Sequence, residues 1–338
     1  MTSTGFRGVR TSRFRHVYGE CARREACYEG LRITTSAHDS QCCAVNPKLL
    51  AVAIDVAGGG AFQVLPLKWV GKIEYHYGRV CGHSGPVTDL KWNPFNDNVI
   101  ASASDDATVK LWFIPDDGMC RMGERGWLCE LVGHSRRVAY LEWHPAAENI
   151  LASAGLDARV LIWNVSTVEC VVTIDCHQDA VYSMCFNRCG NWLATTCKDR
   201  ILRIVDPRTG NTIRDGAGHE GAKASKVVFM SDKGLLLTTG FSKTSRRQIA
   251  VWNQNDLSKP LTMLESDSAA GVLFPFYDQE LSLLFIAGKG ESRARTTVEP
   301  GLICDETALL GVLFSDRKQL GSYCRDVFSY WGHVADYS

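Results

Sequence analysis

The chain has 338 residues, enough for one large all-β or α/β barrel domain or for two ordinary domains. Lysine plus arginine and aspartate plus glutamate number 37 each, so the net charge of zero argues against nucleic acid or an anionic membrane as the default partner. No apolar run approaches the roughly 20 residues that span a bilayer, and the first residues lack the apolar core of a signal peptide. We therefore expect a cytoplasmic protein without an integral membrane segment and without a nucleic acid partner.

The N-terminal segment is locally basic. Residues 1–34 contain seven arginines and three glutamates, a local charge of +4 in an otherwise neutral chain. Arginine at this density can bind a carboxylate-rich protein surface through paired hydrogen bonds. The alternative is that these are solvated charges on a strand that closes a ring, where they would contribute little energy. The sequence leaves both interpretations open.

From Gly82 onward the chain repeats itself. Segments that begin GHSGPVTDL, GHSRRVAYL and CHQDAVYSM each continue, at nearly constant distances, with an aspartate and then a tryptophan or valine. Successive histidines lie 51, 43 and 42 residues apart, at His83, His134, His177 and His219. A period of about 40–45 residues with these features is typical of the four-stranded blade of a WD-repeat β-propeller. Alternating apolar and polar residues within each unit also favour strands over helices.

The recurring polar residues predict a hydrogen-bonded group inside each unit. The tryptophan N–H only donates, serine and histidine donate and accept, and the aspartate carboxylate accepts, so a buried chain of the four satisfies every member. The predicted structural sets are His83, Ser102, Asp106 and Trp112, then His134, Ser153, Asp157 and Trp163, and finally His177 with Asp199. The third unit has Val205 at the tryptophan position and the fourth has Arg246 at the aspartate position, so we expect both to depend more on apolar packing.

A Ser/His/Asp nucleophilic triad is the catalytic alternative for these residues. It would need one exposed serine at a sharp turn and an oxyanion site, whereas the residues recur in each unit. We therefore expect no enzyme and no catalytic residue. The fourteen cysteines include no C-x-x-C pair, which favours reduced, buried thiols, and neither a metal nor another cofactor is expected.

Several stretches resemble the coronins, WD-repeat proteins that bind actin. They are SRFRHVYG at 12–19, CYE at 27–29, CAVNP at 43–47, AGGGAF at 57–62, WNPFND at 92–97 and GVLFPFYD at 271–278. The resemblance covers roughly residues 9–290, and its N-terminal and GVLFPFYD stretches are not general WD-repeat features. The third and sixth units are similar to the type I/II coronins of animals.

The resemblance implies an all-β, seven-bladed WD-repeat propeller, followed in the family by a linker and a coiled coil. It also implies binding to filamentous actin and, through the coiled coil, to the actin-nucleating complex of actin-related proteins, and so a place in the actin cytoskeleton at the cell cortex. The family's actin-contacting arginine falls on Arg32, while Arg13, Arg15, Arg23 and Arg24 are actin-binding candidates from charge alone. A generic WD-repeat scaffold without actin binding is the alternative.

The resemblance ends before the family's seventh blade. After Gly290 the chain shows neither the repeat period nor heptads, so no coiled coil is expected and the hypothesis is a 3′ end that replaces the family's sequence. We predict a propeller of about six blades, the last incomplete, over residues 1–295, with residues 1–38 contributing a closing strand and a divergent tail over 296–338. A ring that lacks a blade would expose sheet edges and apolar blade faces.

Overall fold

The computed structural model describes residues 15–17, 27–74, 77–118, 126–230, 233–278, 283–290 and 294–297. The regular elements in these ranges are 26 β-strands, which form six four-stranded sheets and one two-stranded pair. Among the described residues no helix is long and apolar enough to cross a membrane. The all-β class expected from the sequence is confirmed.

The six sheets are numbered here in chain order, and their strands are given in pairing order. The first sheet contains β3 (Cys43–Val45), β4 (Leu49–Val56), β5 (Gly59–Pro66) and β7 (Arg79–His83); the second contains β8 (Val87–Asn93), β9 (Asn96–Ser104), β10 (Thr108–Phe113) and β11 (Cys129–Val132). The third contains β12 (Val138–Trp143), β13 (Ile150–Gly155), β14 (Val160–Asn164) and β15 (Glu169–Ile174).

The remaining three sheets follow the same plan. The fourth contains β16 (Val181–Phe186), β17 (Leu193–Cys197), β18 (Ile201–Val205) and β19 (Thr212–Ala217); the fifth contains β20 (Lys226–Met230), β21 (Leu235–Phe241), β22 (Arg247–Asn253) and β23 (Thr262–Glu265). The sixth contains β24 (Leu273–Asp278), β25 (Leu283–Gly288), β26 (Ala294–Thr297) and β1 (Arg15–Val17). The two-stranded pair is β2 (Tyr28–Glu29) with β6 (Gly71–Lys72).

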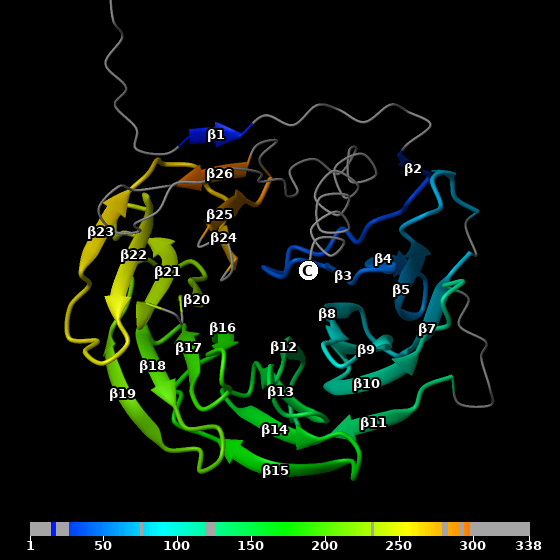
Figure 1. The fold of residues 1–338 in the computed structure, drawn as a ribbon, viewed down its shortest axis with the longest axis horizontal. Coiled ribbons are helices and arrows are strands. Elements are labelled where there is room, and N and C mark those ends of the chain that lie inside the picture. Colours follow the sequence, from blue (N-terminus) through cyan, green and yellow to red (C-terminus); the bar gives the residue numbers. More distant parts are fainter. Residues whose placement is uncertain are drawn as a thin grey trace, which may run out of the picture.

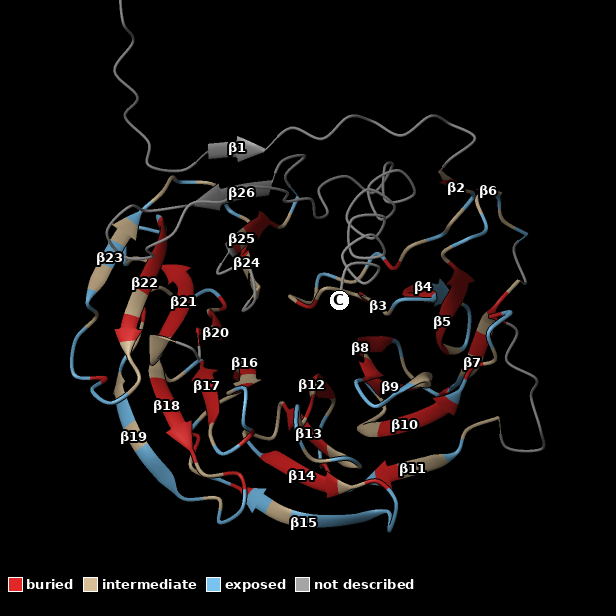
Figure 2. Ribbon diagram, viewed as in Figure 1, coloured by how far each residue is buried: buried red, intermediate tan, exposed pale blue. Residues whose placement is uncertain are grey.

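The sheets lie around one axis in chain order, as Figure 1 shows, with the first strand of each unit near the axis and the fourth at the rim. All neighbouring strands within the six sheets are antiparallel, and the first five sheets are meanders of strands in chain order. Figure 2 shows the consequence for burial: second and third strands of the blades, such as β13, β14 and β17, are largely buried, whereas the outer strands β15 and β19 are mostly exposed. The predicted β-propeller is confirmed, with six blades in the described residues.

The sixth sheet combines the two ends of the described chain. β1 pairs with β26, with Arg15 opposite Thr296 and Val17 opposite Ala294. The sequence repeat predicts an incomplete last blade and a closing strand from residues 1–38; β1, which lies within those residues, gives this sheet four strands like the others. β26 runs past the expected domain boundary at residue 295, and the tail from residue 298 on lies outside the described residues.

Apolar side chains fill the space between neighbouring sheets. Leu49 and Val64 of the first sheet pack with Leu90, Ile100 and Trp112 of the second. Successive side chains of a strand point to opposite faces, so alternate residues of β4 face the second sheet. Comparable clusters lie between each later pair of sheets.

Hydrogen bonds from side chains reinforce these interfaces near the axis. Trp143 Nε1 donates to the carbonyl oxygen of Lys91 at 3.1 Å, and Trp92 Nε1 donates to that of Ala44 at 3.2 Å. Thr88 Oγ1 donates to the carbonyl oxygen of Val138 at 2.6 Å. The bonds join successive blades at the strands that lie closest together.

The β2–β6 pair covers the other face of the first sheet. Leu50, Val52 and Leu65 point away from the second sheet and are buried against Tyr28 and its neighbours. The hydroxyl of Tyr28 donates to the carbonyl oxygen of Pro66 at 3.1 Å, which ties the cover to the sheet. The apolar blade face that the sequence predicts to be exposed is therefore buried on the first sheet.

Candidate functional site

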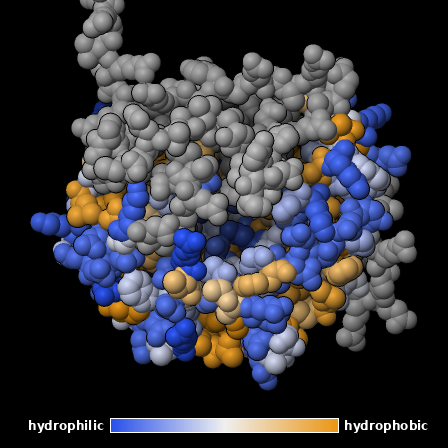
Figure 3. Space-filling view, viewed as in Figure 1, coloured by the Kyte–Doolittle hydropathy of each residue, from blue (hydrophilic) through white to orange (hydrophobic). Residues whose placement is uncertain are grey.

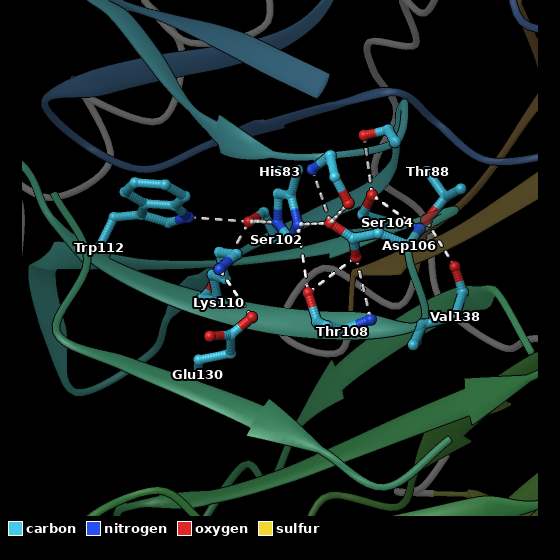
Figure 4. A network of polar contacts seen from close by, with 12 residues as sticks. His83, Thr88, Ser102, Ser104, Asp106, Thr108, Lys110, Trp112, Glu130 and Val138 are labelled. Atoms are coloured by element: carbon cyan, nitrogen blue, oxygen red, sulfur yellow. Dashed lines mark hydrogen bonds and ion pairs between the residues drawn. The ribbon is translucent and has the colours of Figure 1, made fainter. Parts of the chain in front are cut away.

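The polar group of the second sheet joins it to the first. His83, the last residue of β7, places Nδ1 2.9 Å from Asp106 Oδ2 and Nε2 2.7 Å from Ser102 Oγ. Trp112 Nε1 donates to the same hydroxyl at 2.8 Å (Figure 4). Nδ1–H therefore donates to the carboxylate, and Nε2 accepts from Ser102. The four side chains make one continuous chain across the blade junction.

Asp106 is the terminal acceptor of this group. Its carboxylate also accepts from the backbone N–H of Ser84 at 2.9 Å and from the hydroxyl of Thr108 at 2.7 Å. Burial acts to raise the pKa of Asp106, but the hydrogen bonds from His83 and Thr108 outweigh it and hold the pKa well below its ordinary value. These hydrogen bonds thus keep the Asp106 carboxylate ionised.

The third sheet repeats the arrangement. His134 Nδ1 lies 3.1 Å from Asp157, its Nε2 lies 2.8 Å from Ser153 Oγ, and Trp163 Nε1 donates to Ser153 at 2.8 Å. Ser153, like Ser102, is fully buried. A hydroxyl enclosed in this way cannot reach an external substrate, which argues for a structural role over a nucleophilic one.

The fourth sheet departs from the expected pairing of His177 with Asp199. His177 Nε2 lies 2.9 Å from Thr195 Oγ1, but its described hydrogen bonds do not include Asp199. Asp199 pairs instead with Arg203 at 2.7 Å, and both side chains are buried. The buried guanidinium needs a carboxylate more than the neutral imidazole does, so the ion pair forms and the predicted contact is wrong.

The fifth sheet has a complete group that the sequence analysis missed. His219 Nε2 lies 2.9 Å from Thr238 Oγ1, which also accepts from Trp252 Nε1 at 2.8 Å. The carboxamide oxygen of Gln248 lies 3.2 Å from His219 Nδ1 and takes the role of the aspartate. Arg246, at the expected aspartate position, is exposed and pairs with Glu265 at 3.3 Å. This sheet therefore keeps a polar group and does not depend on apolar packing alone.

Thiol and metal chemistry find little support in the described residues. Burial raises the pKa of Cys42 to about 11 and that of Cys185 to about 12, which keeps both as unreactive thiols. In the same ranges no group of three or more His, Cys, Asp or Glu side chains is placed to hold a metal ion. The histidine-centred groups of the described residues are buried polar links between sheets.

Arg32 is the actin-binding candidate whose side chain the structure describes. It is exposed and lies just before Ile33, which bridges to Ile54 of β4. The next two residues are held by Asp55, which accepts from Thr34 Oγ1 at 2.7 Å and from Thr35 Oγ1 at 2.6 Å. Arg32 is thus fixed beside the turn that joins β4 to β5.

The other arginine candidates are only partly placed. The backbone of Arg15 pairs with Thr296 in the sixth sheet. Arg13, Arg23 and Arg24 lie outside the described residues. The prediction that these five arginines bind actin therefore stays a prediction.

One face of the propeller is shown in Figure 3. In the coloured part of this view, hydrophilic side chains lie at and beside the centre, a band of weakly hydrophobic ones lies just below it, and more hydrophobic patches lie towards the rim.

Two kinds of family model match the chain. A domain of unknown function (DUF1899) matches residues 7–72, which include the N-terminal segment and most of the first sheet. The WD domain, G-beta repeat, matches residues 75–112, 127–164 and 168–206. These three repeats end in the second, third and fourth sheets, where the histidine-centred contacts lie.

Curated relatives match most of this chain. Coronin-2A of Homo sapiens is 50% identical over 291 residues, which are 85% of this chain and 55% of the relative. Coronin-2B of Xenopus tropicalis is 51% identical over 286 residues, which are 85% of this chain and 59% of the relative. The chain thus spans between half and two thirds of the length of these relatives.

Solved structures agree with the fold. The WD40 domain of Toxoplasma gondii coronin matches with a TM-score of 0.77 and 31% identity, covering 82% of this chain and 72% of that one. The WD40 β-propeller domain of Doa1 matches with a TM-score of 0.58 and 18% identity over 78% of each chain, which shows the fold alone. With half of its residues identical to coronins over 85% of its length and the six-bladed WD-repeat ring described above, the chain belongs to the coronin family.

Proposed function

We propose that this chain binds actin filaments and regulates the actin cytoskeleton, through basic side chains on the propeller surface of which Arg32 is the first. The observation that carries the proposal is its 50% identity to coronins over 85% of its length. Arg32 supports it further, because the residue is exposed and its backbone is fixed beside the β4–β5 turn. A planar, permanently charged guanidinium suits an acidic protein surface.

The proposal includes a non-enzymatic role in the cytoplasm, at the cell cortex. The fully buried Ser102 and Ser153 support the absence of catalysis, because the candidate nucleophiles are enclosed. Binding to the actin-nucleating complex of actin-related proteins is a weaker part of the proposal. The resemblance assigns that contact to a coiled coil, for which residues 1–338 carry no heptads.

Co-sedimentation of residues 1–338 with actin filaments tests the proposal. The parent protein is expected to pellet with filaments, and less so as salt rises past about 0.15 M, where charges more than about 8 Å apart are screened. Arg32→Asp is expected to reduce pelleting at least tenfold, because it replaces an attractive charge by a repulsive one.

Arg208→Asp is the matched control for Arg32→Asp. Arg208 is exposed in the turn between β18 and β19, which lies at the opposite end of the blades from turns of the β4–β5 kind. The Arg208→Asp protein should pellet with filaments to the same extent as the parent. Pelleting of Arg32→Asp at the parent level would remove Arg32 from the proposal. A parent that stays in the supernatant would favour the alternative, a WD-repeat scaffold for other proteins.

A further inference from the structure

The four residues Ala37–Ser40, here called the latch, lie at the axis of the ring just before β3. In Figure 1 this part of the chain is the blue segment that reaches the centre. Lys289, in the turn after β25, donates from Nζ to the carbonyl oxygens of Ala37 and His38, both at 2.9 Å, and to Asp39 Oδ1 at 2.8 Å. An ammonium group has three N–H donors, so one short segment satisfies all of them.

The latch also contacts the third sheet. His38 Nε2 lies 3.0 Å from the carbonyl oxygen of Ala139, and the ring of His38 packs on that of Tyr140 with centroids 5.1 Å apart. The hydroxyl of Tyr140 donates to the carbonyl oxygen of Asp39 at 3.2 Å. Burial lowers the pKa of His38, which agrees with a neutral ring that donates from Nε2.

Two further contacts extend the latch to the remaining sheets. Lys226 Nζ donates to the carbonyl oxygen of Asp39 at 2.7 Å and to that of Tyr182 at 2.8 Å, which joins the fifth and fourth sheets. Ser40 Oγ donates to Asp89 Oδ1 of the second sheet at 2.8 Å. One segment from the edge of the first sheet is therefore linked, directly or through one side chain, to the other five.

The latch lies between the last sheet and the first, where the innermost strands of neighbouring sheets make the least direct contact. The innermost strands of successive sheets contact one another from β3 to β8 and on through β12, β16, β20 and β24. In the described part of the chain, β24 and β3 make no comparable contact. The bonds from Lys289 to the latch cross this interval, so they join the last sheet to the first.

The latch is also continuous with the segment that carries Arg32. The backbone N–H of Thr34 donates to Ala53 O at 3.0 Å, and that of Ala53 donates to Cys42 O at 2.9 Å. These two bonds attach both ends of the latch to β4. Because Arg32 comes two residues before Thr34, a latch held at the axis limits the movement of the backbone on which Arg32 stands.

We propose that the latch closes the six-bladed ring and holds Arg32 in its binding position, with Lys289 and Lys226 as positioning residues. The first half of this inference is independent of the partner, and the second half rests on the proposed function. Neither lysine needs to touch the partner, since both act through the latch.

Amide hydrogen exchange on residues 1–338 tests ring closure. Lys289→Met keeps the length of the side chain and removes its three donors, so the amides of Thr34 and Ala53 should exchange roughly tenfold faster. Lys289→Arg should restore most of the protection. Lys243→Met is the control, because Lys243 pairs with exposed Glu220 away from the latch and should leave both amides unchanged. Unchanged exchange in Lys289→Met would overturn the latch.

A second variant covers the case in which Lys289→Met does not fold. Asp39→Asn removes one charged acceptor and leaves the carbonyl contacts, so it should speed the same amides by a smaller factor of about three. If the amides of Thr34 and Ala53 exchange as slowly in Asp39→Asn as in the parent, the latch is likewise overturned.

Filament co-sedimentation tests the positioning role separately. Lys289→Met should bind filaments about three- to tenfold more weakly than the parent, less severely than Arg32→Asp, and Lys289→Arg should recover. Faster amide exchange in Lys289→Met with unchanged affinity for filaments would overturn the positioning of Arg32 by the latch but leave the closure of the ring supported. If the parent itself does not bind filaments, the proposed function fails and positioning fails with it, whereas the exchange data still decide whether the latch closes the ring.

Discussion

Asp199 forms an ion pair with Arg203 at 2.7 Å and thereby leaves the imidazole of His177 without a carboxylate partner. Burial and the nearby positive charge of Arg203 lower the pKa of His177 from 6.5 to about 4. An unfolded chain would bind a proton at this residue below pH 6.5, whereas the folded chain does not until about pH 4. The stabilising effect is therefore complete above pH 6.5 and is lost as the pH falls towards 4.

We expect protonation of His177 to lower the unfolding free energy by roughly 3 kcal/mol as the pH falls from 6.5 to 4. Urea denaturation at several pH values measures the slope, and His177→Gln should reduce it because glutamine does not titrate. An NMR titration of the imidazole gives the pKa directly. A midpoint at or above 6.5 would contradict the prediction.

Gln248 and Asp106 accept hydrogen bonds from equivalent histidines, but Asp106 is charged and Gln248 is neutral. We therefore predict that removing these two side chains lowers the unfolding free energy by unequal amounts. Asp106→Ala removes an ionised acceptor with several donors and should lower the unfolding free energy by roughly 2–3 kcal/mol. Gln248→Ala removes a neutral hydrogen bond and should cost about 1 kcal/mol. Chemical denaturation of the two variants side by side gives the comparison, and equal losses would count against it.

Trp143 joins the third sheet to the second through its indole N–H. Trp143→Phe keeps most of the buried ring but removes the bond to Lys91 O, so it should cost about 1–2 kcal/mol. Trp69→Phe is the control, since Trp69 is 49% exposed and should change stability by less than about 0.5 kcal/mol. Thermal unfolding of both variants measures the difference, and a neutral Trp143→Phe would show that the bond adds nothing.

Val168 adopts a backbone conformation that a β-branched residue disfavours. Val168 lies in the turn between β14 and β15, and its φ is 59°. The corresponding turn of the next sheet, between β18 and β19, has Gly210 at a φ of 76°. Val168→Gly should therefore stabilise the protein by about 1 kcal/mol, and because the side chain is 45% exposed little packing is lost.

The matched control for this stabilising change is Val171→Gly. Val171 lies in the extended strand β15 and is 55% exposed, so the same substitution there should cost about 1 kcal/mol. Melting temperatures are expected to move in opposite directions. A lower melting temperature for Val168→Gly would show that the valine is not strained.

Local spacing explains why part of the polar framework could be predicted from the sequence. Ser102 lies 19 residues after His83 and Asp106 lies 23 residues after it, and the third sheet repeats both separations. The lengths of the turns and strands that run from the end of one blade through the first two strands of the next fix these distances. The separation of His219 and Gln248 is 29 residues, so the offset of 23 from the histidine does not reach Gln248, and counting six residues back from Trp252, the other spacing of the repeat, gives Arg246 instead.

The arginine-rich segment shows the limit of reasoning from composition. A local charge of +4 favours an acidic partner but does not say which side chains share a surface. In the described residues, the backbone contacts of Ile33 and Thr34 with β4 fix the place of Arg32. Contacts of this kind have no sequence period from which they could be predicted.

The sequence by itself determined the repeating unit, the all-β class and the histidine-centred groups of the second and third sheets, because those features depend on residues within one blade or at its junction with the next. Only the tertiary structure decided how the ring is held together. Lys289 reaches Asp39 across 250 residues, and β1 pairs with β26 from the other end of the described chain. These partners meet because six twisted sheets curve the chain back on itself, and curvature is a property of the whole ring and not of any one repeat.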